Sequence, residues 1–137
     1  MSVTLQSRHL NAILRLPNLW IAFSGYWAER GARLETATFK ELEVCGVLSR
    51  IPSPSGFRAL VVASAGNTAA AFARACSENG IACLITVPAR GVGKMPFANR
   101  LEVWVKIVRI TGGAGYSDAI AFAKRISEEN GFVDEGG

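Results

Sequence analysis

The sequence predicts an α/β fold: a Rossmann-like, three-layer domain with a parallel sheet, preceded by an N-terminal arm. Two observations indicate this fold. After residue 57, short uninterrupted apolar runs alternate with longer amphipathic segments, and the pattern changes at glycine, proline or asparagine. Strands and helices that alternate at these lengths form right-handed crossovers, which give a parallel sheet with helices on both faces.

The N-terminal segment, residues 1–35, has no long hydrophobic period of its own. Only residues 19–23 are expected to form a short strand, so we expect an arm that packs on a larger body. From Thr38 a helical period begins, with apolar residues near every 3.6 positions and two glutamates in the first turn. It ends before a proline- and serine-rich loop at residues 52–56. The expected division is therefore 1–57, the arm and this helix, and 58–137, the α/β domain.

The second part contains the expected strands and helices of the sheet domain. Apolar runs bounded by turn residues are expected to be buried strands: 59–63, 81–87, 103–110 and a fourth that begins at Phe132. Amphipathic segments are expected to be helices: 67–78, closed by Asn79 and Gly80, and 116–130, with Ile120, Ala123 and Ile126 on one face. We expect a short helix within 91–100 and a glycine-rich turn at 112–115.

Composition excludes several classes of protein. The formal charge is +4, and the basic residues are scattered without interleaved aromatics, so no nucleic-acid surface is expected. Three cysteines without a C-x-x-C pair indicate a reducing compartment, with Cys76 and Cys83 as buried free thiols. No secretory signal and no membrane-spanning run is evident, so a cytoplasmic location without membrane contact is expected. His9 has no metal-ligand or catalytic company, and no metal site is expected.

The turn Ser64-Ala65-Gly66-Asn67-Thr68 is the strongest local feature, because a buried strand passes there directly into a helix. Ligands of open α/β sheets bind at the carboxyl ends of strands, and a helix N-terminus offers free N–H groups to an anion. Gly66 would let the backbone approach a ligand closely. The alternative is that Ser64, Asn67 and Thr68 only cap the helix, and the pattern alone favours neither interpretation.

Lys40 is the second feature, since it stands at the start of a helix within Thr38-Phe39-Lys40-Glu41. The helix macrodipole disfavours a cation there, and this favours the neutral amine, which is the nucleophilic form. A solvated surface lysine is the ordinary alternative.

Together the two segments resemble a known family. Thr38-Phe39-Lys40-Glu41 is similar to the lysine signature of threonine synthases and their relatives, and Ser64-Ala65-Gly66-Asn67-Thr68 is similar to their S-x-G-N-T turn. The order and the separation are those of fold-type-II enzymes that use pyridoxal 5′-phosphate (PLP). Finer points resemble the cysteate synthases, which make cysteate from O-phosphoserine and sulfite: the segments 18–21, 25–27, 60–68 and 131–137.

The resemblance implies a role for each matching residue. Lys40 would bind PLP as a Schiff base and later take the α-proton of the substrate, and Asn67 would hydrogen-bond the cofactor's 3′-hydroxyl group. Ser64, Ala65, Gly66 and Thr68 would hold the substrate carboxylate, partly through backbone N–H groups. Ala65 replaces a hydroxyl residue common in relatives, so binding would depend more on backbone. The substrate would be a phosphorylated amino acid, and the full-length enzyme is expected to be a homodimer.

The resemblance also implies that this sequence is an N-terminal fragment. The family's glycine-rich phosphate loop would lie further along the chain, and residues 112–115 do not match its position. Residues 1–57 would belong to the large domain of the full enzyme, and 58–137 would be its small domain, truncated at the C-terminal end. We expect the isolated fragment to be inactive.

Three other functions remain open. A threonine synthase would act on O-phosphohomoserine, and a non-catalytic α/β module would bind an anionic metabolite at the Ser64–Thr68 turn. A nucleotide-binding Rossmann domain is disfavoured, because the first glycine turn lacks G-x-G-x-x-G and the second strand ends without an acidic residue.

Overall fold

A computed structural model describes residues 1–51, 58–94, 101–113 and 115–135. The chain divides into two compact units, Met1–Phe39 and Lys40–Gly137, each of which is described by itself. The loop expected at residues 52–56 lies outside the described residues.

The first unit consists of short paired elements. Strand β1 (Val3–Leu5) pairs antiparallel with β2 (Ile21–Phe23), and the helix α1 (Arg8–Leu14) lies between them in sequence. Strand β3 (Tyr26–Trp27) pairs antiparallel with β4 (Ala32–Arg33) across the 3₁₀ turn η1 (Ala28–Arg30). Gly31 ends that turn with a φ of +80°, a left-handed conformation that favours glycine.

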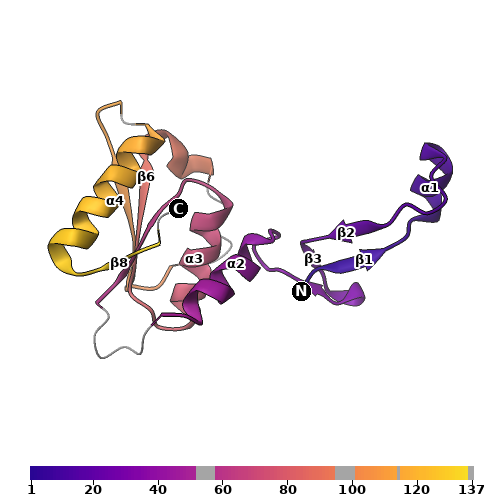
Figure 1. The fold of residues 1–137 in the computed structure, drawn as a ribbon, viewed down its shortest axis with the longest axis horizontal. Coiled ribbons are helices and arrows are strands. Elements are labelled where there is room, and N and C mark those ends of the chain that lie inside the picture. Colours follow the sequence, from indigo (N-terminus) through magenta and orange to yellow (C-terminus); the bar gives the residue numbers. More distant parts are fainter. Residues whose placement is uncertain (52–57, 95–100, 114, 136–137) are drawn as a thin grey trace. The chain divides into compact units, whose positions relative to one another are not determined.

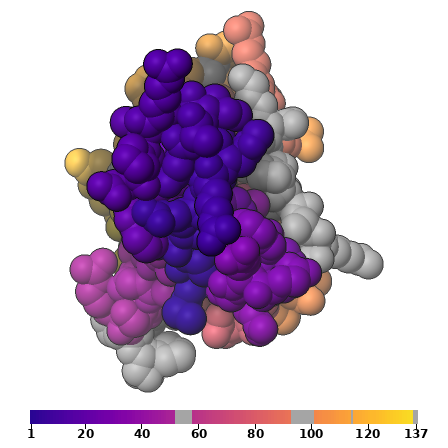
Figure 2. Space-filling model, turned by 90° about the vertical axis from the view of Figure 1, so that its right-hand side faces the viewer, coloured from indigo at the N-terminus to yellow at the C-terminus, as the bar shows by residue number. Residues whose placement is uncertain are grey.

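Much of the first unit's apolar surface is exposed. Ala32 and Leu34 are buried in this unit, whereas α1 has no buried residue. Figure 2 shows the surface of this unit, in indigo and purple, toward the viewer. Its large exposed side chains include Leu10, Ile13, Leu14, Leu16 and Trp20. An arm rich in exposed apolar side chains fits the expectation that this segment packs on a larger body.

The second unit is built on a four-stranded parallel sheet with the strand order β7-β6-β5-β8. In chain order, its strands are β5 (Leu60–Ala63), β6 (Cys83–Pro88), β7 (Val105–Ile110) and β8 (Val133–Asp134). The helices are α2 (Lys40–Leu48), α3 (Asn67–Glu78) and α4 (Tyr116–Asn130), with the 3₁₀ helix η3 (Ala89–Lys94) after β6. The prediction of an α/β fold with a parallel sheet is confirmed.

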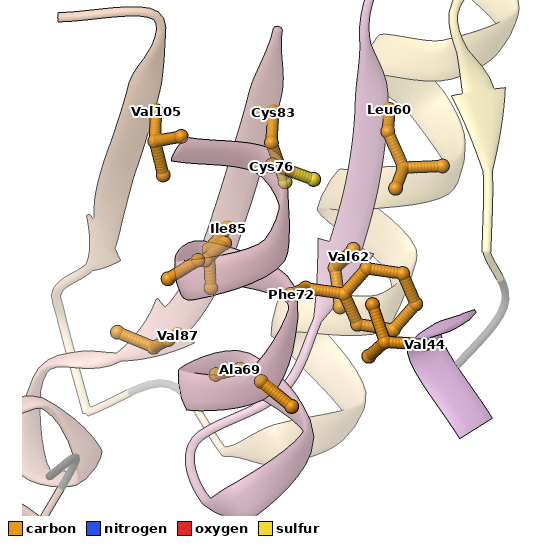
Figure 3. Packing of buried hydrophobic residues seen from close by; sticks show 12 residues of the cluster. Val44, Leu60, Val62, Ala69, Phe72, Cys76, Cys83, Ile85, Val87 and Val105 are labelled. Atoms are coloured by element: carbon orange, nitrogen blue, oxygen red, sulfur yellow. The ribbon is translucent and has the colours of Figure 1, made fainter. Parts of the chain in front are cut away.

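Helices cover both faces of this sheet (Figure 1). Alternate residues of β5 point to opposite faces, as the period of a strand requires. Leu60 and Val62 pack in a cluster with Val44 of α2 and Phe72 of α3, which Figure 3 shows from close by. Val61 and Ala63 pack in a second cluster with Ala123 of α4. The three-layer arrangement predicted from the sequence is therefore present.

One expected helix differs from the structure in its bounds and type. The short helix expected within 91–100 begins at Ala89 and is a 3₁₀ helix as far as Lys94, and residues 95–100 lie outside the described part. The expected division of the full enzyme after residue 57 stays a prediction, and the compact unit that holds the sheet begins at Lys40. The reason is that α2 buries Val44 against the sheet domain and joins it through an ion pair between Glu41 and Arg74.

The three cysteines are placed as the sequence predicts. Cys76 and Cys83 are buried free thiols, and Cys45 is exposed. His9 is exposed. In the part of the chain that the structure covers, the helices are too short or too polar to cross a membrane. Within the same residues, His, Cys, Asp and Glu side chains form no group of three that could hold a metal ion.

Candidate functional site

The link between β5 and α3 lies at the carboxyl edge of the parallel sheet. Ser64 is buried, and its backbone N–H donates to the carbonyl of Thr86 on the neighbouring strand, at 3.2 Å. This bond continues the β5–β6 pairing by one residue and fixes where the chain leaves the sheet. Asn67 is exposed at the first position of α3, and Thr68 is half-buried behind it. The turn predicted from the sequence is therefore placed at the edge where α/β proteins bind ligands.

The start of α3 leaves its hydrogen-bonding groups available. Its first intrahelical bond runs from the N–H of Ala70 to the carbonyl of Gly66, at 3.1 Å, so the N–H groups of Asn67, Thr68 and Ala69 precede the helical ladder. Among the described residues, the side chains of Ser64, Asn67 and Thr68 make no hydrogen bond, so none of them caps this helix. The capping interpretation of the turn is wrong for this structure.

Gly66 leaves open space at the same helix start. Its φ of −148° lies outside the left-handed region that favours glycine. A Cβ atom built on Gly66 would meet no described atom within 4 Å. Neither backbone conformation nor packing against the described residues requires glycine here. The absence of a side chain at Gly66 leaves room in front of the N–H groups at the start of α3.

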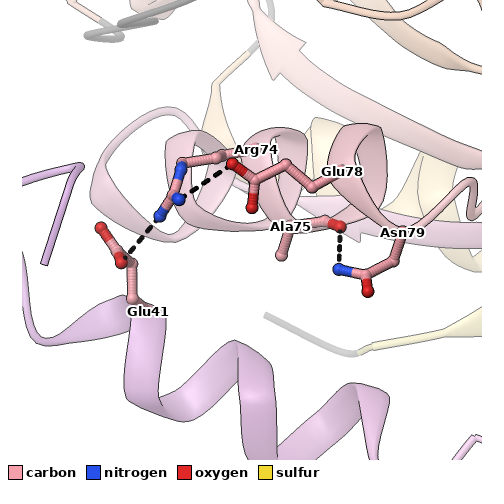
Figure 4. Close-up of polar contacts among 5 residues, drawn as sticks. All are labelled: Glu41, Arg74, Ala75, Glu78 and Asn79. Carbon is pink, nitrogen blue, oxygen red and sulfur yellow. Dashed lines mark hydrogen bonds and ion pairs between the residues drawn. The ribbon is translucent and has the colours of Figure 1, made fainter. Parts of the chain in front are cut away.

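Lys40 begins the helix that lies against α3. Glu41 of α2 and Arg74 of α3 form an ion pair of 3.0 Å, and Val44 packs beside Phe72. Figures 1 and 4 show α2 and α3 running in the same direction, so their N-termini lie at the same end of the helical layer on this face of the sheet. Lys40 and Asn67 are thus the first residues of two neighbouring, similarly directed helices.

The amine of Lys40 is partly exposed and forms an ion pair. Its Nζ atom donates to a carboxylate oxygen of Glu43, three residues along the same helix, and 29% of the Lys40 side chain is exposed. An exposed pair of this kind contributes little stability, because water screens it. The stem of a lysine is flexible, so its amine can reach partners at different positions.

Three further residues shape this edge of the sheet, and the sequence analysis did not single them out. Tyr116, the first residue of α4, donates its hydroxyl hydrogen to the carbonyl of Ala63, directly before the turn, at 2.8 Å. Thr86 is fully buried and donates its hydroxyl hydrogen to the carbonyl of Ala119, at 3.0 Å. A Cβ atom on Gly91 would lie 2.6 Å from the Cβ atom of Ala65. The only sequence signal was that Tyr116 and Gly91 follow strands, and hence lie at their carboxyl ends.

The fold and this site define an α/β protein with an uncapped helix start beside a lysine-bearing helix. The family model for pyridoxal-phosphate dependent enzymes matches residues 11–134, and the chain belongs to this family. Enzymes of this family depend on PLP, so the cofactor expected from the sequence is confirmed.

The chain is similar to several cysteate synthases. It is 41% identical over 135 residues to the cysteate synthase of Methanosarcina acetivorans, and 42% identical over 136 residues to that of Methanocorpusculum labreanum. The cysteate synthase of Methanosarcina barkeri is 40% identical over 135 residues. Each alignment covers 98% of this chain but 32% of the relative, so the chain spans about a third of the length of these enzymes.

The residues present fit PLP. The cofactor needs a lysine amine for its aldehyde, and Lys40 offers one on a partly exposed side chain. The ring hydroxyl needs a hydrogen-bonding partner, and the exposed carboxamide of Asn67 makes no hydrogen bond within the described structure. The open space at Gly66 admits an anionic group to the helix N-terminus.

Proposed function

We propose that the full-length protein carrying this chain is a cysteate synthase, which converts O-phosphoserine and sulfite into cysteate and phosphate. In this reaction the Cβ–O bond to phosphate breaks and a Cβ–S bond to sulfite forms. The structural observation that carries the proposal is the uncapped start of α3, with open space at Gly66, beside the helix that begins with Lys40. The choice of reaction is supported by about 40% identity to cysteate synthases along nearly the whole chain.

Each site residue has a proposed task. PLP, when bound, supplies the electron sink that makes the α-proton of the substrate acidic. The Nζ atom of Lys40 binds the cofactor and takes that proton once substrate has displaced it. The carboxamide of Asn67 hydrogen-bonds the cofactor's 3′-hydroxyl group and orients its ring.

The substrate carboxylate is proposed to bind at the start of α3. The backbone N–H groups near Asn67 and Thr68 and the hydroxyl groups of Ser64 and Thr68 are the available donors. Ala65 contributes only its backbone, since its methyl group faces Gly91. Charge-assisted bonds from N–H groups to a carboxylate are about twice as strong as neutral ones, so backbone donors suffice for this task.

The chain is proposed to divide between the two domains of the whole enzyme. We propose that residues 1–57 belong to its large domain, which would cover the exposed apolar side chains of the arm. Residues 58–137 would form its small domain. The complete enzyme is proposed to be a homodimer, and light scattering of the purified protein would test this.

A chimeric enzyme tests the proposed reaction. Residues 1–137 would replace the matching third of the Methanosarcina acetivorans cysteate synthase. We expect this chimera to form cysteate and release phosphate from O-phosphoserine when sulfite is present. Phosphate release from O-phosphohomoserine, with threonine as the product, would instead identify a threonine synthase.

Lys40→Ala is the decisive variant of this chimera. Borohydride reduction in the presence of PLP should label Lys40 in the parent chimera, as peptide mapping would show, and the variant should have no turnover. Full cysteate formation by Lys40→Ala, or a label on another lysine, would contradict the proposed role. A parent chimera that binds an anion at the Ser64–Thr68 turn but neither catalyses the reaction nor takes a PLP label at Lys40 would favour a non-catalytic module.

A further inference from the structure

Arg74 of α3 connects two carboxylates through its two terminal nitrogens (Figure 4). Its Nη1 atom lies 3.0 Å from Oε2 of Glu41, and its Nη2 atom lies 2.8 Å from Oε1 of Glu78. The Glu41 side chain is only 12% exposed and that of Arg74 21%, whereas Glu78 is half exposed. The bond to Glu41 is therefore the shielded one, and it joins two different helices.

Arg74 lies on the same stripe of α3 as Asn67. Residues seven and eleven positions apart return to nearly the same side of a helix, so Asn67, Arg74 and Glu78 form one line along α3. Glu41 meets this line at Arg74 and directly follows Lys40 in the sequence. The line of residues that begins with Asn67, the proposed cofactor-binding amide, therefore also contacts the start of α2, the helix that carries Lys40.

The ion pair supplies something that the apolar contact between these helices does not. Val44 and Phe72 hold α2 against α3, but burial of apolar surface is non-directional and tolerates sliding along the helix axis. A hydrogen bond from a guanidinium group to a carboxylate is directional, so it defines the axial position of Glu41 relative to Arg74. Lys40, one residue away, is positioned with it.

We propose that Arg74 is a positioning residue for Lys40. It fixes the first turn of α2 along α3 so that the lysine amine reaches the cofactor held by Asn67. Arg74 itself touches neither cofactor nor substrate in this role. The inference rests on the proposed function, because Lys40 must be the cofactor lysine for its position to matter.

The test uses Arg74→Gln in the chimera, with Arg125→Gln as the matched control. Arg125 also pairs with a glutamate, Glu129, at 3.9 Å, but this exposed pair lies within α4 on the opposite face of the sheet. We expect Arg74→Gln to lower kcat by about ten- to a hundred-fold, the scale of a displacement of about 1 Å at a reacting group. It should also slow borohydride-trapped labelling of Lys40 by PLP. Arg125→Gln should change neither quantity.

Glu41→Gln separates positioning from folding. It keeps the shape of the side chain and removes the same pair from the other partner, so it should slow Lys40 labelling as Arg74→Gln does. The double variant should label Lys40 no more slowly than Arg74→Gln alone, because both substitutions break the same Glu41–Arg74 pair. If Arg74→Gln does not fold, the labelling rate of Glu41→Gln decides.

The outcomes distinguish the two proposals. Labelling of Lys40 at the parental rate in a folded Arg74→Gln or Glu41→Gln chimera would overturn the positioning role alone. Additive effects of the two substitutions would overturn it as well. A parent chimera in which PLP never labels Lys40 would overturn the proposed function, and the positioning role with it.

Discussion

At the scale of single residues, Glu135 shows how the end of β8 responds to pH. Burial raises the pKa of this carboxyl above its ordinary value of 4.5, Glu43 and Asp134 raise it further, and Arg50 lowers it. As pH rises from 4.5 to the raised value, the unfolded chain releases this proton before the folded one does. The free energy of unfolding therefore falls through this window.

Glu135→Gln removes that titration. We expect the variant to be more stable than the parent chain above the raised pKa, and the difference to vanish below pH 4.5. Urea unfolding at a series of pH values would measure it. Glu128→Gln, on the exposed face of α4, is the control and should leave the pH profile unchanged. Equal profiles for Glu135→Gln and the parent would contradict the prediction.

The site residues differ in how far the sequence could predict them. Lys40, Ser64, Gly66 and Asn67 were identified because each stands in a local motif at the start of a helix or the end of a strand. Their roles remain proposals. Arg74, Tyr116 and Gly91 were missed, since their importance comes from partners 33, 53 and 26 positions away. Hydrophobic periodicity carries no information about such distant polar and steric contacts.

At the scale of elements, long periodic segments were predicted well and short paired ones were not. The bounds of α3 and α4 match the expected helices, and each buried strand of the sheet was placed within two residues. Strands β1, β3 and β4 contain two or three residues, so only their pairing partner makes them strands. Helix α1 has seven residues, so the helical spacing of Leu10, Ile13 and Leu14 was too short a pattern to predict it.

The contact of η3 with the Ser64–Thr68 turn gives a prediction at this scale. Because a Cβ atom on Gly91 would lie 2.6 Å from that of Ala65, Gly91→Ala must push the 3₁₀ helix and the turn apart. We expect it to lower the free energy of unfolding by about 1–3 kcal/mol, as for an overpacked site. Urea unfolding of the variant would measure this change.

Gly46→Ala is the matched control for Gly91→Ala. Gly46 lies within α2, and a Cβ atom there would meet no described atom within 4 Å. Alanine favours a helix over glycine, so this substitution should raise the free energy of unfolding by about 0.5–1 kcal/mol. If both variants were stabilised alike, the tight approach between η3 and the turn would be absent in solution.

At the scale of the whole molecule, the chain spans about a third of the length of its relatives. Half of the Leu42 side chain is exposed on α2, the helix that begins with Lys40, and the arm exposes four aliphatic side chains on and next to α1. Apolar surface of this kind marks faces that a partner covers. In the proposed enzyme, residues outside 1–137 would enclose the far side of a cofactor at Lys40.

An isolated protein of residues 1–137 should therefore bind PLP weakly and catalyse nothing. Lys40 can still react with the aldehyde, but without an enclosing domain water hydrolyses the adduct, and desalting removes the cofactor. The visible absorbance of a PLP–lysine adduct should thus be lost on desalting, while the chimera keeps it. Borohydride added before desalting should trap the adduct on Lys40 in both proteins. Absorbance that survives desalting of the isolated protein, together with phosphate release from O-phosphoserine, would show that residues 1–137 already form a complete site.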